Sequence, residues 1–254
     1  MTLDLNADLG ESFGAWTMGD DAALLSVVTS ANVACGFHAG DPTVMARTVD
    51  LALAAGVAIG AHPGYADLQG FGRRAMALSP QEAHDLVLYQ IGALDGFLRA
   101  RGARLNHVKP HGALYNAAAV DAGLAQAIAE AVKAFDPGLL LVGLAGSAII
   151  TAGERLALAT ASEAFADRAY ESNGTLTPRS LPGAVLSSDE DIVARVVRMV
   201  RCGSVQARSG EDISLRVDTL CLHGDGPHAV WFAKALRTAL QAEGIALAPL
   251  RRRT

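Results

Sequence analysis

The chain has 254 residues, of which 51% are hydrophobic and 19% are charged. This length and apolar content can bury the core of one barrel-sized domain or of two small domains. Lysine and arginine number 21 against 26 aspartate and glutamate, and the formal net charge of -5 gives no general attraction to nucleic acid or to an anionic membrane. We therefore expect a single domain over residues 1–254, with a small-molecule substrate and neither nucleic acid nor a membrane as a partner.

Two further features bear on the cellular compartment. Residues 1–6 reach an acidic group at once and lack the basic-then-apolar order of a signal peptide. The longest apolar stretch, around 139–150, is shorter than the roughly 20 residues that a membrane-spanning helix needs. The cysteines are odd in number and lack paired spacing, which is typical of a reducing compartment. We expect a cytoplasmic protein whose thiols Cys35, Cys202 and Cys221 are free.

Short apolar segments alternate with helical patterns along the chain. The expected strands are 3–9, 30–37, 57–62, 105–111, 139–145, 156–163 and 219–223. Strands separated by helices pair in parallel through right-handed crossovers. Nearly every segment ends in polar residues, which is typical of a barrel whose site is built from many strand ends, rather than of an open sheet with one switch point. We therefore predict an α/β fold: a parallel seven-stranded (β/α) barrel.

Helix-start signals agree with this alternation. Residues 79–82 (Ser-Pro-Gln-Glu) form a capping-box pattern with proline at the first helical position. The Asp-Pro pair at 41–42 and the Ser-Asp-Glu-Asp run at 188–191 predict two more helix starts. The longest irregular stretch, 165–187, exceeds a simple connection, so we predict that it is an active-site loop.

Alternation along the strands places polar side chains on one face. In the first strand Asn6 and Asp8 lie opposite Leu5 and Ala7, because successive strand residues point to opposite faces. The same parity applies to the polar ends of the later strands. The residues expected to face the barrel mouth are Asn6, Asp8, His62, Lys109, His111, Glu163, His223 and Asp225.

Four of the seven histidines close an apolar strand and are followed within two residues by glycine: His38, His62, His111 and His223. Glycine lets the backbone turn sharply and approach a ligand, and imidazole exchanges a proton or binds a metal near neutral pH. The recurrence at equivalent positions favours a functional role over that of a hydrogen-bonded turn residue. The other three, His84, His107 and His228, are expected to be structural.

Some polar residues keep two interpretations. Asp41 and Asp225 stand near helix starts, so each carboxylate either caps free backbone donors or takes part in the chemistry. Arg73 lies in a glycine-rich loop, where its guanidinium either holds a carboxylate or phosphate or is solvated. The chain contains neither a G-x-x-x-x-G-K-[ST] phosphate loop nor a G-x-S-x-G nucleophile elbow. A P-loop nucleotide site is excluded, and a serine-hydrolase triad is not expected.

Several sequence blocks closely resemble the LamB/YcsF family, and together they span almost the whole chain. They lie at 5–11 (LNADLGE), 32–42 (NVACGFHAGDP), 60–65 (GAHPGY), 70–74 (GFGRR), 107–116 (HVKPHGALYN), 163–170 (EAFADRAY) and 223–225 (HGD). The resemblance implies the A subunit of a bacterial 5-oxoprolinase, which cleaves 5-oxoproline (pyroglutamate) to L-glutamate while ATP is hydrolysed to ADP and phosphate. It also implies partner subunits B and C, and a barrel similar to those of glycoside hydrolases and polysaccharide deacetylases.

This resemblance suggests roles for the predicted residues. With ATP as co-substrate, Asp8 or Glu163 would act as general base towards water, while Lys109, with nearby imidazoles such as His62, stabilises charge on oxygen. Arg73 or Arg168 would hold the substrate carboxylate. The other residues predicted to bind substrate are Asn6, His38, Asp41, His111, Asn116, Asp167, His223 and Asp225.

Two alternatives remain open. Asp8, His38 and His62 could form the Asp-His-His site of a metal-dependent deacetylase, so a divalent metal is a possible cofactor. The chain could instead be a carrier or regulatory subunit that binds a small lactam or sugar while partners do the chemistry. In the absence of a Walker motif, the nucleotide is bound here in another way or is shared with the partner subunits.

Overall fold

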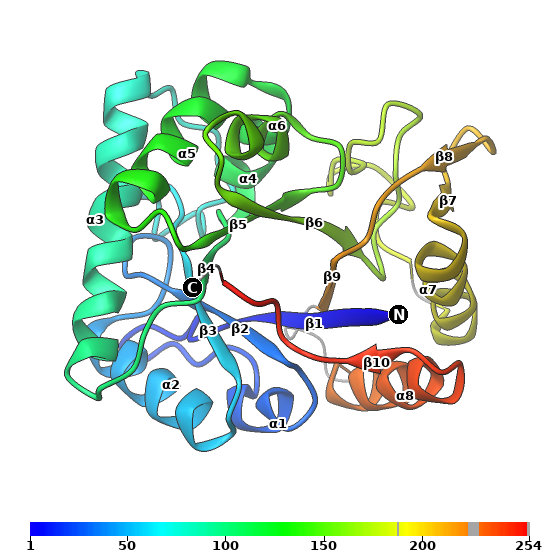
Figure 1. The fold of residues 1–254 in the computed structure, drawn as a ribbon, viewed down its shortest axis with the longest axis horizontal. Helices are drawn as coiled ribbons and strands as arrows, with labels where there is room; N and C mark the ends of the chain where they lie inside the picture. The colour runs from blue at the N-terminus through cyan, green and yellow to red at the C-terminus, as the bar shows by residue number, and fades with distance from the viewer. Residues whose placement is uncertain (187, 223–228, 253–254) are drawn as a thin grey trace.

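The computed structural model describes residues 1–186, 188–222 and 229–252, and these form a closed β/α barrel (Figure 1). The barrel strands are β1 (Thr2–Leu9), β2 (Ser30–Ala34), β3 (Ala58–His62), β4 (His107–Val108), β5 (Leu140–Leu144), β6 (Ala159–Phe165) and β9 (Thr219–Leu222). Neighbouring strands pair in parallel in this order, and pairing of β9 with β1 closes the ring. The predicted parallel seven-stranded barrel is confirmed.

Helices surround the barrel on its outside. They are α1 (Asp21–Leu25), α2 (Pro42–Ala54), α3 (Pro80–Arg99), α4 (Gly112–Val120), α5 (Ala122–Phe135), α6 (Ala148–Arg155), α7 (Asp189–Cys202) and α8 (Ala229–Ala242). Helix α3 lies at one side of the molecule, and α7 lies at the opposite side (Figure 1).

The three predicted helix starts are confirmed by their caps. The Ser79 hydroxyl accepts a hydrogen bond from the Glu82 amide while the Glu82 carboxylate accepts from the Ser79 amide, which is the complete capping box. Asp41 caps α2, and Ser188 caps α7. These short side chains satisfy backbone donors that the first helical turn leaves free.

Several predicted strand boundaries are wrong. The segment predicted at 105–111 contains only the two-residue strand β4. Beyond it, the Lys109 amide donates to the Ala61 carbonyl at 2.9 Å and the His111 amide to the Pro63 carbonyl at 2.8 Å. Pro110 between them has no N–H to donate, so the chain follows its neighbour without a regular ladder.

Turns displace two other strands. The segment predicted at 156–163 starts late, because Ala157 adopts a left-handed φ of 59° in the turn after α6, and β6 runs instead from Ala159 to Phe165. The segment predicted at 30–37 ends at Ala34, shortly before Gly36 turns with a φ of 97°. Glycine tolerates this positive φ, so the backbone can leave the sheet there.

Three short strands were not predicted. The strand β10 (Ala246–Leu247) pairs with the start of β1, while β7 (Ser204–Gln206) and β8 (Asp212–Ser214) form a separate antiparallel pair beside α7 (Figure 1). Two or three residues are too few to show the alternation by which strands are recognised.

Alternation along β1 separates an apolar layer from a polar lumen. Its odd-numbered side chains from Leu3 to Leu9 are buried in the core between barrel and helices. Asp4 lies in the lumen, where its carboxylate accepts hydrogen bonds of 2.6 Å from both Thr29 and Ser30. Burial raises the pKa of Asp4, against the effect of these hydrogen bonds. The barrel interior is therefore a hydrogen-bonded polar core rather than an apolar one.

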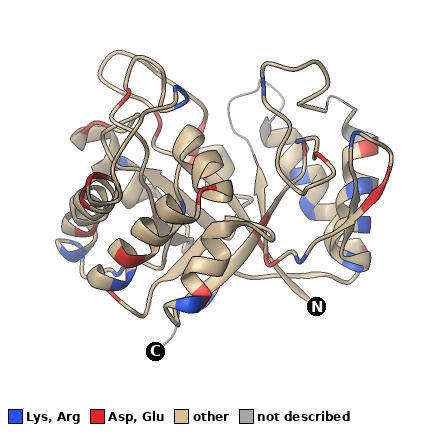
Figure 2. Ribbon diagram, turned by 90° about the horizontal axis from the view of Figure 1, so that it is seen from above, with Lys and Arg blue, Asp and Glu red and all other residues tan. Residues whose placement is uncertain are grey.

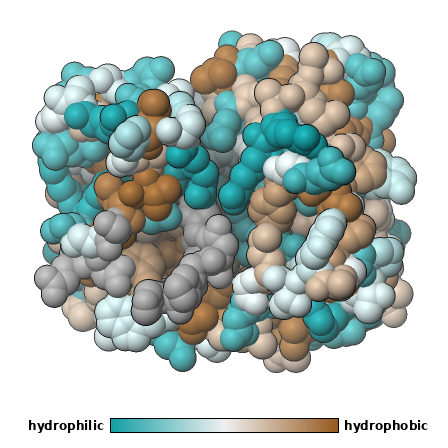
Figure 3. Space-filling view, turned by 180° about the vertical axis from the view of Figure 1, so that it is seen from behind, coloured by the Kyte–Doolittle hydropathy of each residue, from teal (hydrophilic) through white to brown (hydrophobic). Residues whose placement is uncertain are grey.

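The outer surface shows no single dominant charge. Positive and negative residues are interspersed around the outer helices (Figure 2), in keeping with the small net charge. On one face the surface is hollowed between its two sides, and hydrophilic residues gather along that hollow (Figure 3). Within the described ranges, no helix is both long and apolar enough to cross a bilayer.

Candidate active site

A buried lysine stands between two carboxylates at the barrel mouth. Lys109, which follows β4 and is 2% exposed, places its Nζ 2.9 Å from Asp8 Oδ1 and 2.9 Å from Glu163 Oε1. The Cys221 thiol lies 3.2 Å from the same nitrogen. These side chains come from β1, β6 and β9, so closure of the barrel is what brings them together.

Amide side chains hold the carboxylates in place. The Asn6 amide donates to Glu163 Oε1 at 3.0 Å, and the Asn32 amide donates to Asp8 Oδ1 at 2.8 Å and to Asn6 Oδ1 at 2.7 Å. The ring of His107 supports this frame, with Nε2 2.8 Å from Asn32 Oδ1. A Cβ at Gly60 would lie 2.1 Å from that nitrogen, so the frame requires glycine beside the ring.

The lysine pair is ionised at neutral pH. Burial alone would raise the pKa of Asp8, but His62 and Lys109 outweigh burial and hold this pKa well below its usual range. Burial lowers the pKa of Lys109, but Asp8, Cys221 and Glu163 raise it well above its ordinary value. The mouth thus presents a fixed ammonium flanked by carboxylates, which suits stabilisation of charge that develops on a substrate oxygen.

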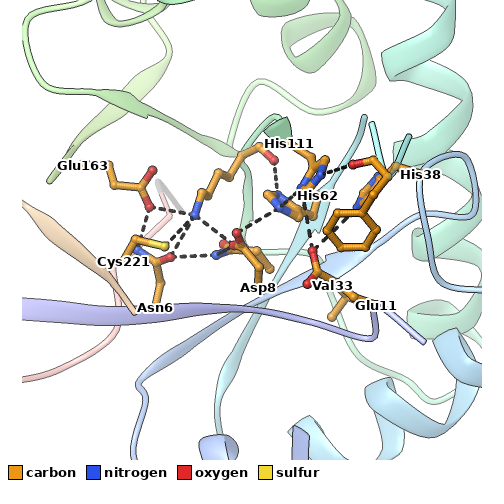
Figure 4. A network of polar contacts seen from close by, with 12 residues as sticks. Asn6, Asp8, Glu11, Val33, His38, His62, His111, Glu163 and Cys221 are labelled. Atoms are coloured by element: carbon orange, nitrogen blue, oxygen red, sulfur yellow. Dashed lines mark hydrogen bonds and ion pairs between the residues drawn. The ribbon is translucent and has the colours of Figure 1, made fainter. Parts of the chain in front are cut away.

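Three histidine rings adjoin this group, and Figure 4 shows the network running from Glu163 through Asp8 to His38. Asp8 Oδ2 lies 3.2 Å from His62 Nε2, which is 3.0 Å from His111 Nδ1. The His111 ring stacks on that of His38, with centroids 3.8 Å apart and an interplanar angle of 4°.

Glu11 completes a group that could hold a metal ion. Glu11, His38, His62 and His111 each offer one ligand atom, and these atoms all lie within 4.8 Å of one another. The sequence-based set of candidate ligands shares His38 and His62 with this group. The carboxylate of Asp8, the third candidate, instead contacts Lys109 and His62.

A cavity of about 740 Å³ adjoins this group of side chains. Its floor is lined by Asp8, Glu11, His62, Lys109 and His111. Its walls include the predicted substrate-binding residues Arg73, Asn116 and Arg168. The structure thus brings together most of the predicted site, and the volume falls within the range of small-molecule pockets, about 300–1,000 Å³.

Three of the remaining predicted residues contact side chains that line this cavity without lining it themselves. Asn6 and Glu163 are buried in the lumen, and His38 is buried behind His111. Asp167 precedes Arg168 on the loop after β6. His223 and Asp225 lie outside the described residues.

Asp41 serves as a helix cap. Its Oδ1 accepts from the amides of Thr43 at 2.8 Å and Val44 at 3.1 Å, and its Oδ2 accepts from the Gly14 amide at 2.7 Å. These backbone hydrogen bonds lower the pKa of Asp41. Its role in substrate binding stays a prediction.

Arg168 braces the predicted active-site loop, which is irregular as expected. Its Nη2 donates to the Thr177 carbonyl at 2.6 Å and its Nε to the Ala184 carbonyl at 3.2 Å. Burial, and then the nearby Arg179, lower the pKa of this guanidinium. Arg168 thus shapes the cavity wall as well as adding positive charge to it.

Glu11, Asn32, Tyr115 and Arg179 are among the site residues that were not predicted. Glu11, Asn32 and Tyr115 stand inside sequence blocks that carry the family resemblance, and that position is the signal that could have identified them. The buried Tyr115 borders the cavity, and burial followed by the effect of Glu163 raises its pKa well above the ordinary value. Arg179 lines the cavity from the long loop and has no such signal.

Comparison with known proteins assigns the family. The sequence profile of the LamB/YcsF family matches residues 3–254. The chain belongs to the LamB/YcsF family. A relative from Bacillus subtilis (strain 168), named as the A subunit of 5-oxoprolinase, is 61% identical over 243 residues, covering 96% of this chain and 95% of the relative. A protein of the same name from Methylococcus capsulatus is 62% identical over 249 residues, covering 98% of this chain and 96% of the relative.

A solved structure from this family agrees with the fold. The lactam utilization protein from Thermus thermophilus is 51% identical and superposes with a TM-score of 0.92, covering 98% of this chain and all (100%) of that chain. The β/α barrel is thus shared along the whole length of that family member.

Proposed function

We propose that this chain acts as the A subunit of an ATP-dependent 5-oxoprolinase. The reaction opens 5-oxoproline to L-glutamate with hydrolysis of ATP to ADP and phosphate, in a cytoplasmic complex with subunits B and C. The names of the relatives support the substrate. The observation that carries the proposal is the buried Lys109 ammonium between Asp8 and Glu163 at the floor of the cavity.

The chemistry explains why such a floor is needed. Transfer of the terminal phosphoryl group of ATP to the lactam oxygen leaves ADP and activates the ring carbon. Water then adds to that carbon, and the ring C–N bond breaks as the nitrogen takes a proton, leaving an acyl phosphate. A second water releases phosphate and glutamate. In the first addition the electron pair moves to the ring nitrogen, and in the second the acyl oxygen takes up negative charge, which a preorganised ammonium stabilises.

Structure and exposure suggest different roles for the two carboxylates. Asp8 is 17% exposed and borders the cavity, so it can accept a proton from water held there. Glu163 is fully buried at 0% exposure and contacts Lys109 from below. We therefore assign Asp8 as the general base, Glu163 as the residue that positions Lys109, and His62 as a partner that orients Asp8.

Arginines supply the binding charge. Arg73, Arg168 and Arg179 line the cavity together. We propose that Arg73 holds the carboxylate of 5-oxoproline, since a guanidinium binds a carboxylate through two parallel hydrogen bonds. Arg73→Ala should then raise KM for 5-oxoproline at least about tenfold while leaving KM for ATP unchanged. Equal increases in both constants would contradict this assignment.

The activity is tested by coupled measurement of ADP and glutamate in the complex reconstituted with partner subunits. Asp8→Asn and Lys109→Met should each lower kcat by at least about 100-fold, the usual effect of losing a positioned base or charge. Asp85→Asn, which alters an exposed carboxylate on α3, serves as the matched control. Near-normal turnover in both site variants would overturn the proposal.

A second candidate function is a metal-dependent hydrolase that needs neither ATP nor partners. The group of Glu11 with three histidines favours it, because catalytic zinc sites use such ligands. This candidate predicts ester or amide hydrolysis by the isolated chain, abolished by a chelator and insensitive to ATP. Activity that requires both ATP and the partner subunits would exclude it.

A further inference from the structure

The hydrogen bonds of His62 and His111 fix where each ring carries its proton. His62 Nδ1 lies 2.8 Å from the Lys109 carbonyl oxygen, and His111 Nε2 lies 2.8 Å from the Phe71 carbonyl oxygen. A carbonyl oxygen only accepts, so each of these ring nitrogens must be the N–H donor. In the neutral rings the other two nitrogens, His62 Nε2 and His111 Nδ1, therefore carry lone pairs.

These two lone-pair nitrogens lie 3.0 Å apart. Two acceptors at this distance repel each other unless a positive charge lies between or beside them. The surroundings add negative charge, because Asp8 Oδ2 is 3.2 Å from His62 Nε2 and Glu11 Oε1 is 3.7 Å from His111 Nδ1. Both rings are buried, so bulk water does not relieve the conflict. The site therefore requires a cation.

A proton on one ring would satisfy only that pair of nitrogens. It would leave His38 unsatisfied. This side chain is 0% exposed, and neither of its ring nitrogens has a hydrogen-bond partner within the described part of the chain. His38 Nε2 lies 4.0 Å from Glu11 Oε1, on the same side of the cluster as His111. An ion shared by several ligands satisfies more of these groups than a proton does.

We propose that a divalent transition-metal ion of the zinc class binds between Glu11, His62 and His111, with His38 as a weaker fourth ligand. The imidazole-rich set selects zinc, cobalt or nickel over magnesium and calcium, which prefer oxygen ligands. The outer hydrogen bonds from His62 and His111 to backbone carbonyls are those that metal-binding histidines usually make.

Ring geometry explains why His38 is the weaker ligand. An ion bound to imidazole lies near the plane of the ring, and the His38 and His111 planes are nearly parallel with centroids 3.8 Å apart. One ion cannot lie in both planes, so His38 must tilt before it can bind. A Cβ at Gly64 would come within 2.5 Å of His38 Nδ1, and one at Gly72 within 2.8 Å of His38 Cβ, so both glycines are needed for this close packing.

Metal binding is measured on the full chain, independently of any reaction. Protein stripped with EDTA is titrated with Zn²⁺ and with Co²⁺, and metal content, affinity by chelator competition and the visible absorption of bound Co²⁺ are recorded. The expected result is one ion per chain with cobalt absorption typical of nitrogen and oxygen ligands. Absence of stoichiometric binding for both ions would overturn the proposal and leave a shared proton as the cation.

Variants test the ligand set. Glu11→Gln, His62→Gln and His111→Gln should each weaken Zn²⁺ binding by more than about 100-fold, beyond the usual effect of losing an outer partner of a ligand. His38→Gln should weaken it by about tenfold, and His84→Gln on α3 is the matched control with no expected change. Circular dichroism checks that each variant is folded. If a variant does not fold, the cobalt spectrum of the unaltered protein still tests whether the chain binds the metal.

A variant at Asp8 distinguishes this ligand set from the sequence-based set of Asp8, His38 and His62. Asp8→Asn should weaken Zn²⁺ binding by about 10- to 100-fold, the usual effect of losing a group that contacts a ligand, and so by less than Glu11→Gln, because Asp8 contacts Lys109 and His62 rather than belonging to the group. Loss of binding in Asp8→Asn with retention in Glu11→Gln would overturn the assignment. Failure of the lactam reaction would leave these binding results untouched, so the two proposals are tested separately.

Discussion

The two ends of the polar network differ in how completely their groups are satisfied. At the lysine end, formed by Asn6, Asp8, Lys109, Glu163 and Cys221, the ammonium is matched by carboxylates that amide side chains hold in place. At the histidine end, formed by Glu11, His38, His62 and His111, two ring nitrogens face each other as acceptors and a third ring lacks hydrogen-bond partners among the described residues. Glu163 Oε2 is the one atom of the first end without a hydrogen-bond partner among the described residues, whereas the second end still needs a cation.

The largest expected effect comes from removing the ammonium group of the lysine end. Lys109→Met leaves the buried Glu163 and Asp8 without their shared ammonium, and we expect a loss of about 3–5 kcal/mol in the free energy of unfolding, as when one partner of a buried ion pair is removed. Urea denaturation at pH 7 measures this loss. The double variant with Glu163→Gln should recover part of the stability, because one of the two stranded charges is gone. No recovery would mean that the ion pair is not what stabilises this end.

Acid should destabilise the hydrogen-bonded frame of Asn6, Asn32 and His107 next to the lysine end, because His107 takes up a proton. Burial, followed by the charge of Lys109, lowers the pKa of His107 to about 3. The unfolded chain binds a proton at this ring below about pH 6.5 while the folded chain does not, so stability is present above that pH and falls as the pH drops towards 3. The slope is about 1.4 kcal/mol per pH unit for one such group. In EDTA, His107→Gln should show a pH slope lower by this amount, and an unchanged slope would contradict the assignment.

A smaller effect should follow from crowding the histidine end. Gly64→Ala places a methyl group against His38 Nδ1, and overpacking of this kind costs about 1–3 kcal/mol. The same substitution should weaken Zn²⁺ binding by displacing the ring. Gly92→Ala on α3 is the matched control: nothing lies within 4 Å of its added Cβ. Alanine there should stabilise the helix by about 0.5–1 kcal/mol. Similar changes in both variants would show that His38 is not held tightly.

The smallest effect lies outside both ends. Ser79→Ala removes the capping box of α3, and we expect a loss of about 1 kcal/mol in the free energy of unfolding. Turnover of the assembled complex and Zn²⁺ affinity should not change. A fall in turnover or in Zn²⁺ affinity would mean that the stability of α3 affects the barrel mouth, so that stability and function are coupled in this barrel.

The barrel and its lysine end could be predicted from sequence because both follow from alternation. Parity on β1 placed Asn6 and Asp8 in the lumen, and closure of the ring brought them to Lys109 and Glu163. Glu11 escaped prediction because it follows the strand, where alternation no longer determines direction. The sequence leaves two interpretations of Asp41; the structure shows three backbone donors for the helix cap, and the role in substrate binding stays a prediction.

Other parts of the site depend on geometry that no local pattern contains. The conflict between His62 and His111 exists only because carbonyls from Lys109 and Phe71, on separate segments, fix the two rings. The sequence pattern favoured a functional role for both histidines, but it gave no indication that their lone pairs meet. The two-residue strands β4 and β10 were mispredicted or missed for a related reason, since their pairing is set by neighbours rather than by their own residues.

Arg168 holds the cavity wall together through contacts that are separate from those of the cavity floor. One guanidinium ties together the Thr177 and Ala184 carbonyls, and antiparallel bridges join Arg168 to Val185 and Tyr170 to Leu176. The segment between these ties lines the cavity at residues 173–180 but contributes no strand to the barrel. If the proposed lactam reaction holds, redesign for larger or smaller cyclic amides can therefore begin at residues 173–180, with the arginine brace and the cavity floor left as they are.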